Sequence, residues 1–326
     1  MSGRDEPGVS RPSPMSARTR FLGVIGWPVA HSHSPAMQNA ALAALGLDWV
    51  YGAFAVASEA LEQAVAGARA LGFIGLNVTV PHKVAALGLC RPDALAERVG
   101  AVNTLVFPTE PGGETRGLNT DVHGFRRLLA EAGLLDGGAV HCQGRPLRAA
   151  LLGAGGAARA VAVALVDEGV ETHVVRRGAR RIELPGLALE HHDFGAAALA
   201  ALLPTVDLLV DTTPRGLGPG PGSEGQEGAA VDLMASAPAP APTYPEQEVG
   251  LLPRHALVVD LVVRRETPLV AAARARGLRA CTGAAMLLHQ GAAALEAWTG
   301  RAAPLTVMRA ALGRSLGGSE ADILAS

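Results

Sequence analysis

Apolar residues in the first third of the chain form short runs, separated by segments in which apolar positions recur at helical spacing. The predicted strands cover 21–25, 49–56 and 73–80, and the predicted helices between them cover 35–46 and 58–71. Ser34 is a good N-cap for the first helix, and Pro35 suits its first turn. This alternation of strands and helices predicts an α/β fold with a mostly parallel sheet.

A second series of the same kind begins near residue 148. Its predicted strands cover 149–152, 171–175, 206–210 and 256–263, and its predicted helices cover 157–168, 268–277 and 283–298. The segment 214–250 is rich in Gly, Pro, Ala and Ser, and we expect it to be a long mobile loop. A length of 326 residues, at about 150 residues per domain, suggests two domains.

Composition and charge exclude several classes of protein. The 28 Lys and Arg residues nearly balance the 30 Asp and Glu residues, so the net charge of −2 predicts no nucleic acid and no anionic membrane as partner. A hydrophobic content of 49% predicts a globular protein. Residues 1–20 lack an apolar core, so we expect a flexible leader rather than a secretory signal. The cysteines Cys90, Cys142 and Cys281 form no CxxC pair, which favours reduced thiols and a cytoplasmic location.

One lysine stands out among the basic residues. Of the 28 basic residues, Lys83 is the only Lys, which leaves 27 Arg. The four Asn of the chain and Lys83 all lie between positions 39 and 119. Because an amine can give up a proton and a guanidinium effectively cannot, we expect Lys83 to have a function that Arg would not serve.

Neutral polar residues gather near predicted strand ends in the first half of the chain. They are Ser32, Ser34, Asn77, Thr79 and Asn103. Hydroxyls and amides suit a polyhydroxylated small molecule, because they offer donors and acceptors without the desolvation cost of many charges. Asp121 could hold Lys83 in its charged form, ready to protonate an alkoxide as hydride reaches a carbonyl. For Ser34 and Thr120, capping of a helix is the competing interpretation.

A glycine-rich turn follows the strand predicted at 149–152. The sequence from Gly153 to Ala158 fits G-x-G-x-x-G/A between a strand and a helix, which favours a pyrophosphate at the helix N-terminus. The next strand ends in an Arg-rich stretch that includes Arg176 and Arg180, where NAD-binding proteins usually have an acidic residue. Guanidinium groups match a 2′-phosphate, so the sequence predicts NADP(H); a solvated basic loop is the alternative.

Two histidine pairs invite a search for a metal site. One pair is His31 with His33, and the other is His191 with His192. Neither pair has a third and a fourth ligand at a plausible sequence spacing. We therefore expect no metal site.

Several longer motifs resemble those of the shikimate dehydrogenase family, in the family's order. They are GWPVAHSHSP at 26–35, NVTVPHK at 77–83, AVNT at 101–104, GLNTD at 117–121, GAGGAARA at 153–160, TPL at 267–269 and GAAMLLHQ at 283–290. The resemblance covers nearly all of residues 21–300. It implies a substrate-binding and catalytic domain of 21–121 plus 283–326, and a Rossmann-like NADP-binding domain of 122–282, with substrate held in the cleft between them.

The resemblance also implies the reaction and the roles of individual residues. The reaction would be reversible NADPH-dependent reduction of 3-dehydroshikimate to shikimate, with Lys83 and Asp121 as the acid–base pair. Substrate would be bound by Ser32, Ser34, Asn77, Thr79, Asn103 and Gln290. NADP(H) would be bound by Gly153, Ala154, Gly155, Gly156, Ala157, Arg176, Arg180, Thr213, Val262, Gly283 and Met286.

The sequence departs from the family's pattern in places that bear on specificity. The family's Asp-x-x-Tyr before Thr-Pro-Leu has no Tyr here, where Val262 and Val263 stand. The family's Asn-Ala-Thr-Pro appears as Asp211-Thr212-Thr213-Pro214. A quinate or aminoshikimate dehydrogenase, and a non-catalytic nucleotide- or polyol-binding paralogue, therefore stay open as alternatives. A homodimer is compatible with the sequence.

Overall fold

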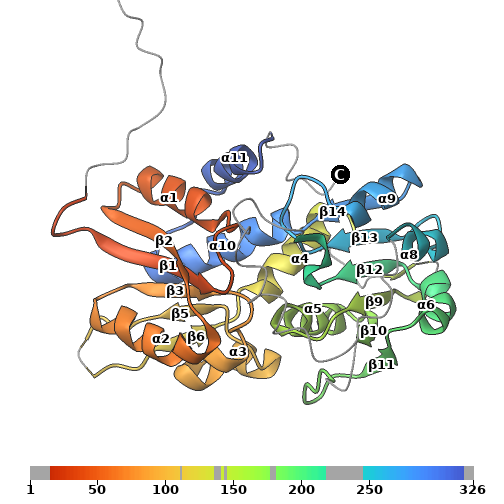
Figure 1. Cartoon of the computed structure of the whole chain (residues 1–326), viewed down its shortest axis with the longest axis horizontal. Helices are drawn as coiled ribbons and strands as arrows, with labels where there is room; N and C mark the ends of the chain where they lie inside the picture. The colour runs from red at the N-terminus through yellow and green to blue at the C-terminus, as the bar shows by residue number, and fades with distance from the viewer. Residues whose placement is uncertain are drawn as a thin grey trace, which may run out of the picture.

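Two six-stranded sheets organise the molecule (Figure 1). The computed structural model describes residues 15–110, 112–135, 141–142, 145–176, 181–217 and 245–318. Strands and helices alternate along most of this chain, and each sheet has apolar clusters packed against it. The predicted α/β class with mostly parallel sheets is confirmed.

The first sheet is mixed. In chain order its strands are β1 (Arg20–Gly26), β2 (Trp49–Ala55), β3 (Gly75–Val78), β4 (Arg91–Pro92), β5 (Thr104–Val106) and β6 (Arg116–Leu118), and their spatial order is β2-β1-β3-β5-β6-β4. Strand β1 pairs in parallel with β2 and β3, while β5 runs antiparallel to β3 and β6. The carboxyl ends of β1 and β3 therefore lie side by side, which brings the loops that follow them together.

Helices from both ends of the chain cover this sheet. They are α1 (Ser34–Ala44), α2 (Leu61–Ala70), α3 (Ala94–Val99), α4 (Asp121–Glu131), α10 (Ala284–Thr299) and α11 (Leu305–Ser315), with short 3-10 turns at Ser58–Ala60 and Ala85–Leu89. Helix α10 returns from the far side of the molecule and packs along α4 (Figure 1). Ser34 is the first residue of α1 rather than its N-cap, because His33 occupies the cap position and Pro35 lies in the first turn.

The second sheet is wholly parallel. Its strands are β9 (Arg148–Leu152), β10 (Glu171–Arg176), β11 (Leu189–Asp193), β12 (Leu208–Asp211), β13 (Leu257–Asp260) and β14 (Arg279–Thr282), in the spatial order β11-β10-β9-β12-β13-β14. That order is the one found in Rossmann folds, whose two halves meet beside the first strand. Apolar clusters lie on both faces of the sheet, so its central strands consist almost entirely of buried apolar residues.

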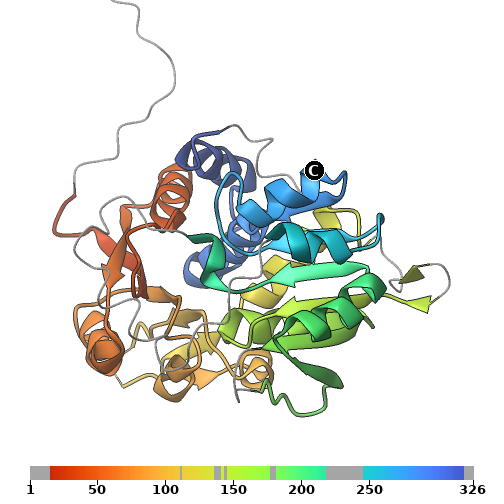
Figure 2. The same ribbon diagram turned by 45° about the vertical axis from the view of Figure 1, so that its right-hand side comes forward.

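Helices flank the second sheet as well (Figure 2). They are α5 (Gly156–Asp167), α6 (Ala196–Leu202), α8 (Pro245–Leu251) and α9 (Pro268–Ala275), with 3-10 turns at Leu203–Thr205 and Pro214–Leu217 and a small hairpin of β7 (His141–Cys142) and β8 (Arg145–Pro146). Within the described residues, none of the helices is both long and apolar enough to cross a membrane.

Some of the expected boundaries need correction. The segment expected as one loop, 214–250, begins with a 3-10 turn and ends in α8, because Glu248 pairs with partly buried Arg215 and Val249 packs into an apolar cluster. Residues 218–244 of that loop and 1–14 of the leader lie outside the described residues. The domain boundaries at 121/122 and 282/283 stay predictions.

Close packing at Gly75 fastens the returning helix to the first sheet. A Cβ at this position would overlap both the carbonyl oxygen of Leu105 on β5 and the indole of Trp298 on α10. The indole nitrogen of Trp298 donates a hydrogen bond of 3.0 Å to that same carbonyl. Glycine is therefore required on β3 for the contact between β5 and α10.

Substitution at this position tests the contact. We expect Gly75→Ala to lower the free energy of unfolding by about 1–3 kcal/mol, because the added methyl group overpacks the contact and displaces the indole. Gly67→Ala is the matched control: a Cβ there, on α2, meets nothing within 4 Å. A helical Gly→Ala change at an open position should stabilise the protein by about 0.5–1 kcal/mol. Equal effects of the two variants in urea unfolding would contradict the packing argument.

Candidate active site

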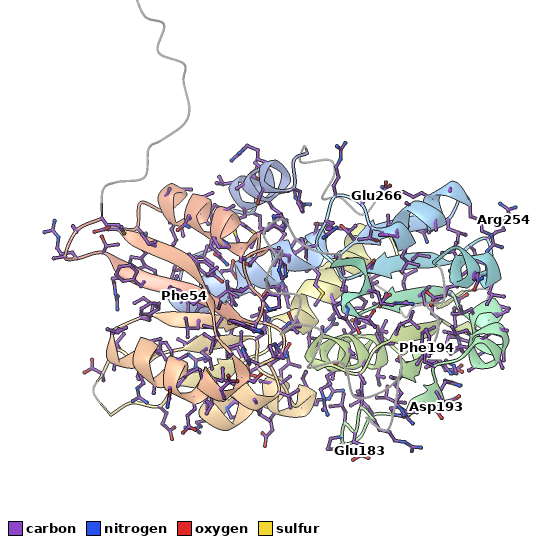
Figure 3. All side chains as sticks on the ribbon, viewed as in Figure 1. Phe54, Glu183, Asp193, Phe194, Arg254 and Glu266 are labelled. Carbon is purple, nitrogen blue, oxygen red and sulfur yellow. The ribbon has the colours of Figure 1, made fainter. Side chains whose placement is uncertain are left out.

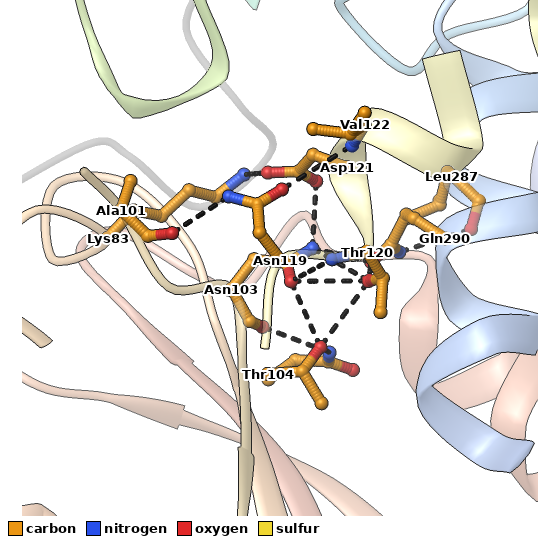
Figure 4. A network of polar contacts seen from close by, with 11 residues as sticks. Lys83, Ala101, Asn103, Thr104, Asn119, Thr120, Asp121, Val122, Leu287 and Gln290 are labelled. Atoms are coloured by element: carbon orange, nitrogen blue, oxygen red, sulfur yellow. Dashed lines mark hydrogen bonds and ion pairs between the residues drawn. The ribbon is translucent and has the colours of Figure 1, made fainter. Parts of the chain in front are cut away.

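The single lysine forms an ion pair with the first residue of α4 (Figure 4). The Nζ atom of Lys83 lies 2.8 Å from Oδ2 of Asp121, and the two side chains are only 13% and 4% exposed. Lys83 lies in the loop after β3, which is held by the buried ring of His82 bonded to the carbonyl of Val56. The backbone N–H of Val102 donates to the carbonyl of Lys83 at 2.8 Å. Both the backbone and the amine of Lys83 are thus fixed in place.

Asn103 orients the carboxylate of this pair. Its Nδ2 donates to Oδ1 of Asp121 at 2.9 Å, while Lys83 donates to the other oxygen. The same amide nitrogen lies 2.9 Å from the hydroxyl of Thr120, and its Oδ1 accepts from the backbone N–H of Thr120 at 2.8 Å. Because both carboxylate oxygens have donors, the buried charge of Asp121 is satisfied and its orientation is defined.

A second layer of polar contacts lies behind Asn103. Asn77 on β3 donates to the backbone carbonyl of Asn103 and to the hydroxyl of Thr104, both at 3.1 Å. Tyr51 on β2 donates to Oδ1 of Asn77 at 2.7 Å, and the buried side chain of Ser34 lies beside the phenol. Burial raises the pKa of Tyr51, so its hydroxyl keeps the proton that it donates. Tyr51 and Thr104 were not among the predicted site residues.

Gln290 reaches the same network from α10. Its Oε1 lies 3.3 Å from Nδ2 of Asn103 and 3.4 Å from the hydroxyl of Thr120. Helices α4 and α10 approach closely because Gly124 has no side chain: a Cβ there would lie 2.7 Å from the carbonyl of Met286. The structure thus gathers Lys83, Asp121, Asn77, Asn103, Ser34 and Gln290, which the sequence predicted from positions far apart.

Ser32 and Thr79 lie on the loops next to this network. Ser32 follows β1, and its hydroxyl accepts from the backbone N–H of Ser34 at 3.3 Å. Thr79 comes directly after β3, two residues beyond Asn77, and its backbone N–H donates to Ile25 of β1. Since β1 and β3 are parallel neighbours, Ser32 and Thr79 both lie where the carboxyl ends of these two strands meet.

The glycine-rich turn joins β9 to α5 in the form that a pyrophosphate requires. Gly153 has a φ of 114°, a left-handed conformation that disfavours residues with a side chain. Gly155 is the N-cap of α5, forms no side-chain cap, and would have open space around a Cβ. Ala154 and Ala157 complete the turn with small side chains. The first N–H groups of α5 are thus accessible to an anion, and the turn fits a dinucleotide.

The glycine turn and the lysine loop meet. A Cβ at Gly156 would lie 2.8 Å from the Cβ of Lys83 and 3.3 Å from its Cδ. The stem of the lysine side chain therefore passes directly over the first residue of α5. This contact places the Lys83–Asp121 ion pair of the first sheet beside the glycine-rich turn of the second.

The predicted 2′-phosphate residues are placed only in part. Arg176 is the last residue of β10; its side chain is buried, and its Nη2 lies 3.2 Å from Asp193 at the end of β11, which is labelled in Figure 3. Arg180 lies outside the described residues. Arg176 is thus at the carboxyl end of the second strand of the fold, where the adenosine ribose binds in Rossmann proteins.

The remaining predicted cofactor residues lie near the carboxyl ends of β12, β13 and β14, in the other half of the second sheet. The backbone N–H of Gly283, before α10, donates to the carbonyl of Val262 at 3.3 Å, and Met286 is buried one turn further along. Thr213 follows β12, and its backbone N–H donates to Oδ1 of Asp211 at 2.8 Å. The predicted cofactor residues that the structure describes therefore lie at the carboxyl ends of β9, β10, β12, β13 and β14 or in the loops that follow them.

One departure from the family's pattern has a structural counterpart. Asp211, which stands where the family usually has Asn, receives Nη2 of Arg215 at 2.6 Å. Arg215 also donates to Glu248 of α8 at 2.8 Å. The extra carboxylate is therefore neutralised within a partly buried ion cluster beside Thr213. At the other departure, Val262 is buried and offers no side-chain hydroxyl.

A carboxylate fastens the helices that carry Asp121 and Gln290. Glu131, at the end of α4, accepts from His289 of α10 at 2.7 Å and from Arg309 of α11 at 2.6 Å. Burial opposes ionisation, but the hydrogen bonds from His289 and Arg309 outweigh it and lower the pKa of Glu131 to about 2. The charged form of Glu131 therefore links three helices behind the site.

Comparison with known proteins places these features in a family. The family model described as the shikimate dehydrogenase substrate binding domain matches residues 24–105, and the shikimate 5′-dehydrogenase C-terminal domain matches residues 283–312. A shikimate dehydrogenase (NADP(+)) of Symbiobacterium thermophilum is 43% identical over 304 residues, covering 90% of this chain and 93% of its own. One of Thermosynechococcus vestitus is 41% identical, covering 93% and 98%.

Solved structures agree with the sequence comparison. Shikimate dehydrogenase of Aquifex aeolicus superposes with a TM-score of 0.72 at 32% identity, over 93% of this chain and 99% of its own. The Thermus thermophilus enzyme, solved in complex with NADP(H) and shikimate, superposes with a TM-score of 0.69 at 35% identity, over 91% and 100%. The resemblance predicted from the sequence motifs is confirmed.

The helix link at Glu131 predicts a pH dependence of stability. Its folded pKa of about 2 lies below the ordinary Glu value of 4.5, so its stabilisation is complete above pH 4.5 and is lost as the pH falls to about 2. Glu131→Gln should lower the free energy of unfolding at neutral pH by about 1–2 kcal/mol, allowing for solvent screening. The difference from wild type should shrink on acidification. Exposed Glu62→Gln is the control, and a Glu131→Gln deficit that is constant with pH would contradict the link.

Proposed function

The chain belongs to the shikimate dehydrogenase family, and we propose on that premise that it catalyses the reversible NADPH-dependent reduction of 3-dehydroshikimate to shikimate. It would serve the pathway to aromatic amino acid precursors. The observation that carries the proposal is the buried ion pair of Lys83 and Asp121, packed against Gly156 of the dinucleotide turn. This arrangement supports proton transfer beside a bound dinucleotide.

The chemistry divides between cofactor and protein. NADPH, when bound, supplies the hydride for the C3 carbonyl of the substrate. The ammonium of Lys83 donates the proton that the developing alkoxide takes up, and in the reverse direction the neutral amine accepts it. Asp121 holds Nζ of Lys83 at 2.8 Å and thereby fixes the direction of the transfer. Asn103 keeps this carboxylate from rotating.

Substrate binding follows from the neutral polar groups around the pair. Ser32, Ser34, Asn77, Thr79, Asn103 and Gln290 would bind the carboxylate and hydroxyls of the substrate. Their amides and hydroxyls offer both donors and acceptors, as a polyhydroxylated ring needs. Asn77 is held by Tyr51 and Thr104, so its orientation is set before substrate arrives. Preorganisation of this kind reduces the entropy lost on binding.

Cofactor binding is assigned to the carboxyl edge of the second sheet. The turn of Gly153, Ala154, Gly155, Gly156 and Ala157 would hold the pyrophosphate at the N-terminus of α5. Arg176, with Arg180, would bind the 2′-phosphate that distinguishes NADPH from NADH. Thr213, Val262, Gly283 and Met286 would surround the nicotinamide. Bound phosphate would compete with Asp193 for the guanidinium of Arg176.

A second candidate activity rests on the missing tyrosine. Because buried Val262 offers no hydroxyl, a related alcohol such as quinate or aminoshikimate could take the place of shikimate. Assays of shikimate, quinate and aminoshikimate with NADP⁺ and NAD⁺ separate these activities by their kcat/KM ratios. Tight NADPH binding without turnover of any of the three would instead indicate a non-catalytic paralogue.

Location and assembly complete the proposal. Among the described side chains, Cys90 and Cys281 are free, which supports a cytoplasmic enzyme. The net charge of −2 supports one that binds neither nucleic acid nor membrane. Assembly as a homodimer is the proposed oligomeric state. Analytical ultracentrifugation of the purified chain tests it.

Replacement of the lysine tests the acid–base assignment. We expect Lys83→Ala to lower kcat by about 10²- to 10⁴-fold, because the proton donor is lost, with little change in the dissociation constant of shikimate. Lys83→Arg should not restore turnover, because a guanidinium keeps its proton. Exposed Val84→Ala, on the same loop, is the control for local disturbance and should retain activity. Near-normal kcat in Lys83→Ala or in Lys83→Arg would refute the role of proton donor.

Replacement of Arg176 tests the cofactor assignment. We expect Arg176→Ala to raise the KM for NADPH about tenfold or more, because one charge-assisted hydrogen bond to the 2′-phosphate is lost. The KM for NADH should stay nearly unchanged. Arg254→Ala is the matched control, since exposed Arg254 precedes β13 at the opposite edge of the sheet. Equal increases for both cofactors would show that Arg176 supports the fold rather than the 2′-phosphate.

A further inference from the structure

Two neighbouring strands at the edge of the second sheet carry a cluster of histidine and glutamate side chains, apart from the catalytic network. In the register of β10 and β11, His173 pairs with Glu190, and His192 lies two residues further along β11. Residues two apart on a strand share a face, so these three side chains project from the same side of the sheet. His191 faces the other side, where it lines a cavity with Ile182 and Leu189.

The donor atoms of the three side chains converge. Nδ1 of His173 lies 3.0 Å from Nε2 of His192 and 3.3 Å from Oε2 of Glu190. All three donor atoms lie within 4.8 Å of one another. Ligands bound to one tetrahedral zinc at about 2.0–2.2 Å lie about 3.3–3.5 Å apart, so small movements of these side chains would complete a coordination shell.

A carboxylate lies behind the ring of His173. Nε2 of His173 lies 2.9 Å from Oε1 of Glu171, and a proton on this nitrogen would leave the lone pair of Nδ1 for a metal ion. Metal-binding histidines usually donate their second ring nitrogen to a carboxylate in this way. Arg148 lies 3.2 Å from the same ring nitrogen and 2.8 Å from Glu171, so the guanidinium balances the negative charge of Glu171.

The three donor atoms face one another across a small gap. Nδ1 of His173 lies within 3.3 Å of both Nε2 of His192 and Oε2 of Glu190. A cation placed among the three atoms can contact all of them at once, whereas a proton bridges only two.

We propose that His173, His192 and Glu190 bind a divalent transition-metal ion of the zinc type. Two imidazoles and one carboxylate suit zinc, cobalt or nickel, whereas magnesium and calcium prefer oxygen ligands alone. Three protein ligands leave a position for water. The ion would fasten the edge strand β11 to β10 and so stabilise this side of the sheet. The sequence alone gave no third ligand for His192, because His173 and Glu190 come together only through strand pairing.

Metal binding by the full-length chain tests the proposal. After treatment with chelator, calorimetric titration with Zn²⁺ should show one saturable site, and the midpoint of thermal unfolding should rise with bound zinc. His192→Gln should weaken zinc binding at least about tenfold, since even the loss of an outer-shell partner costs 10- to 100-fold. His191→Gln, on the adjacent position but the opposite face, should bind zinc like wild type.

The same experiments can overturn the proposal. Absence of saturable binding to wild type would mean that the hydrogen bonds within the cluster are sufficient and that no metal ion binds there. Equal affinity in His192→Gln and wild type would place the ion elsewhere. If His192→Gln fails to fold, Glu190→Gln, whose side chain is 66% exposed, provides the same comparison. Anomalous diffraction at the zinc edge should locate the ion between β10 and β11, and a peak near His31 and His33 instead would refute the site.

Discussion

The ion pair between Lys83 and Asp121 is the interaction on which the rest of the site depends. Both side chains are largely buried, and buried charges are tolerated only where each has its partners. The fold meets this demand by bringing four elements together: the loop after β3 carries the amine, α4 the carboxylate, β5 begins beside Asn103, and α10 adds Gln290. Removal of the amine or of Asn103 would leave an oxygen of the buried Asp121 carboxylate without its donor.

The same pair ties the two sheets into one functional unit. Glycine at 156 lets the side chain of Lys83 pass over the start of α5, the helix that follows the glycine-rich turn. Glycines at 75 and 124 similarly let α10 approach β3, β5 and α4. These glycines act by making room for a neighbouring element, whereas Gly153 acts through its left-handed backbone.

Much of this could be predicted from the sequence, because its signals are local. Short stretches of sequence are enough to recognise the alternation of strands and helices, the turn at 153–158 and the single lysine. The structure brings the predicted polar residues together as a network. Other features depend on strand pairing, which leaves no local signal. Nothing in the local sequence distinguishes Tyr51 from other strand residues. Its hydroxyl reaches Asn77 only because β2 and β3 belong to the same sheet. Strand β11, with His191 and His192, lacks the apolar run that marks a buried strand and was not predicted.

A structure of the ternary complex with shikimate and NADP⁺ tests the central claim most directly. The quantity to measure is the distance from Nζ of Lys83 to the oxygen on C3 of the substrate. We predict a hydrogen bond of about 2.7–3.2 Å between these two atoms, with Asp121 still in contact with the amine. An amine directed into solvent, with another group of the protein bonded to that oxygen, would contradict it.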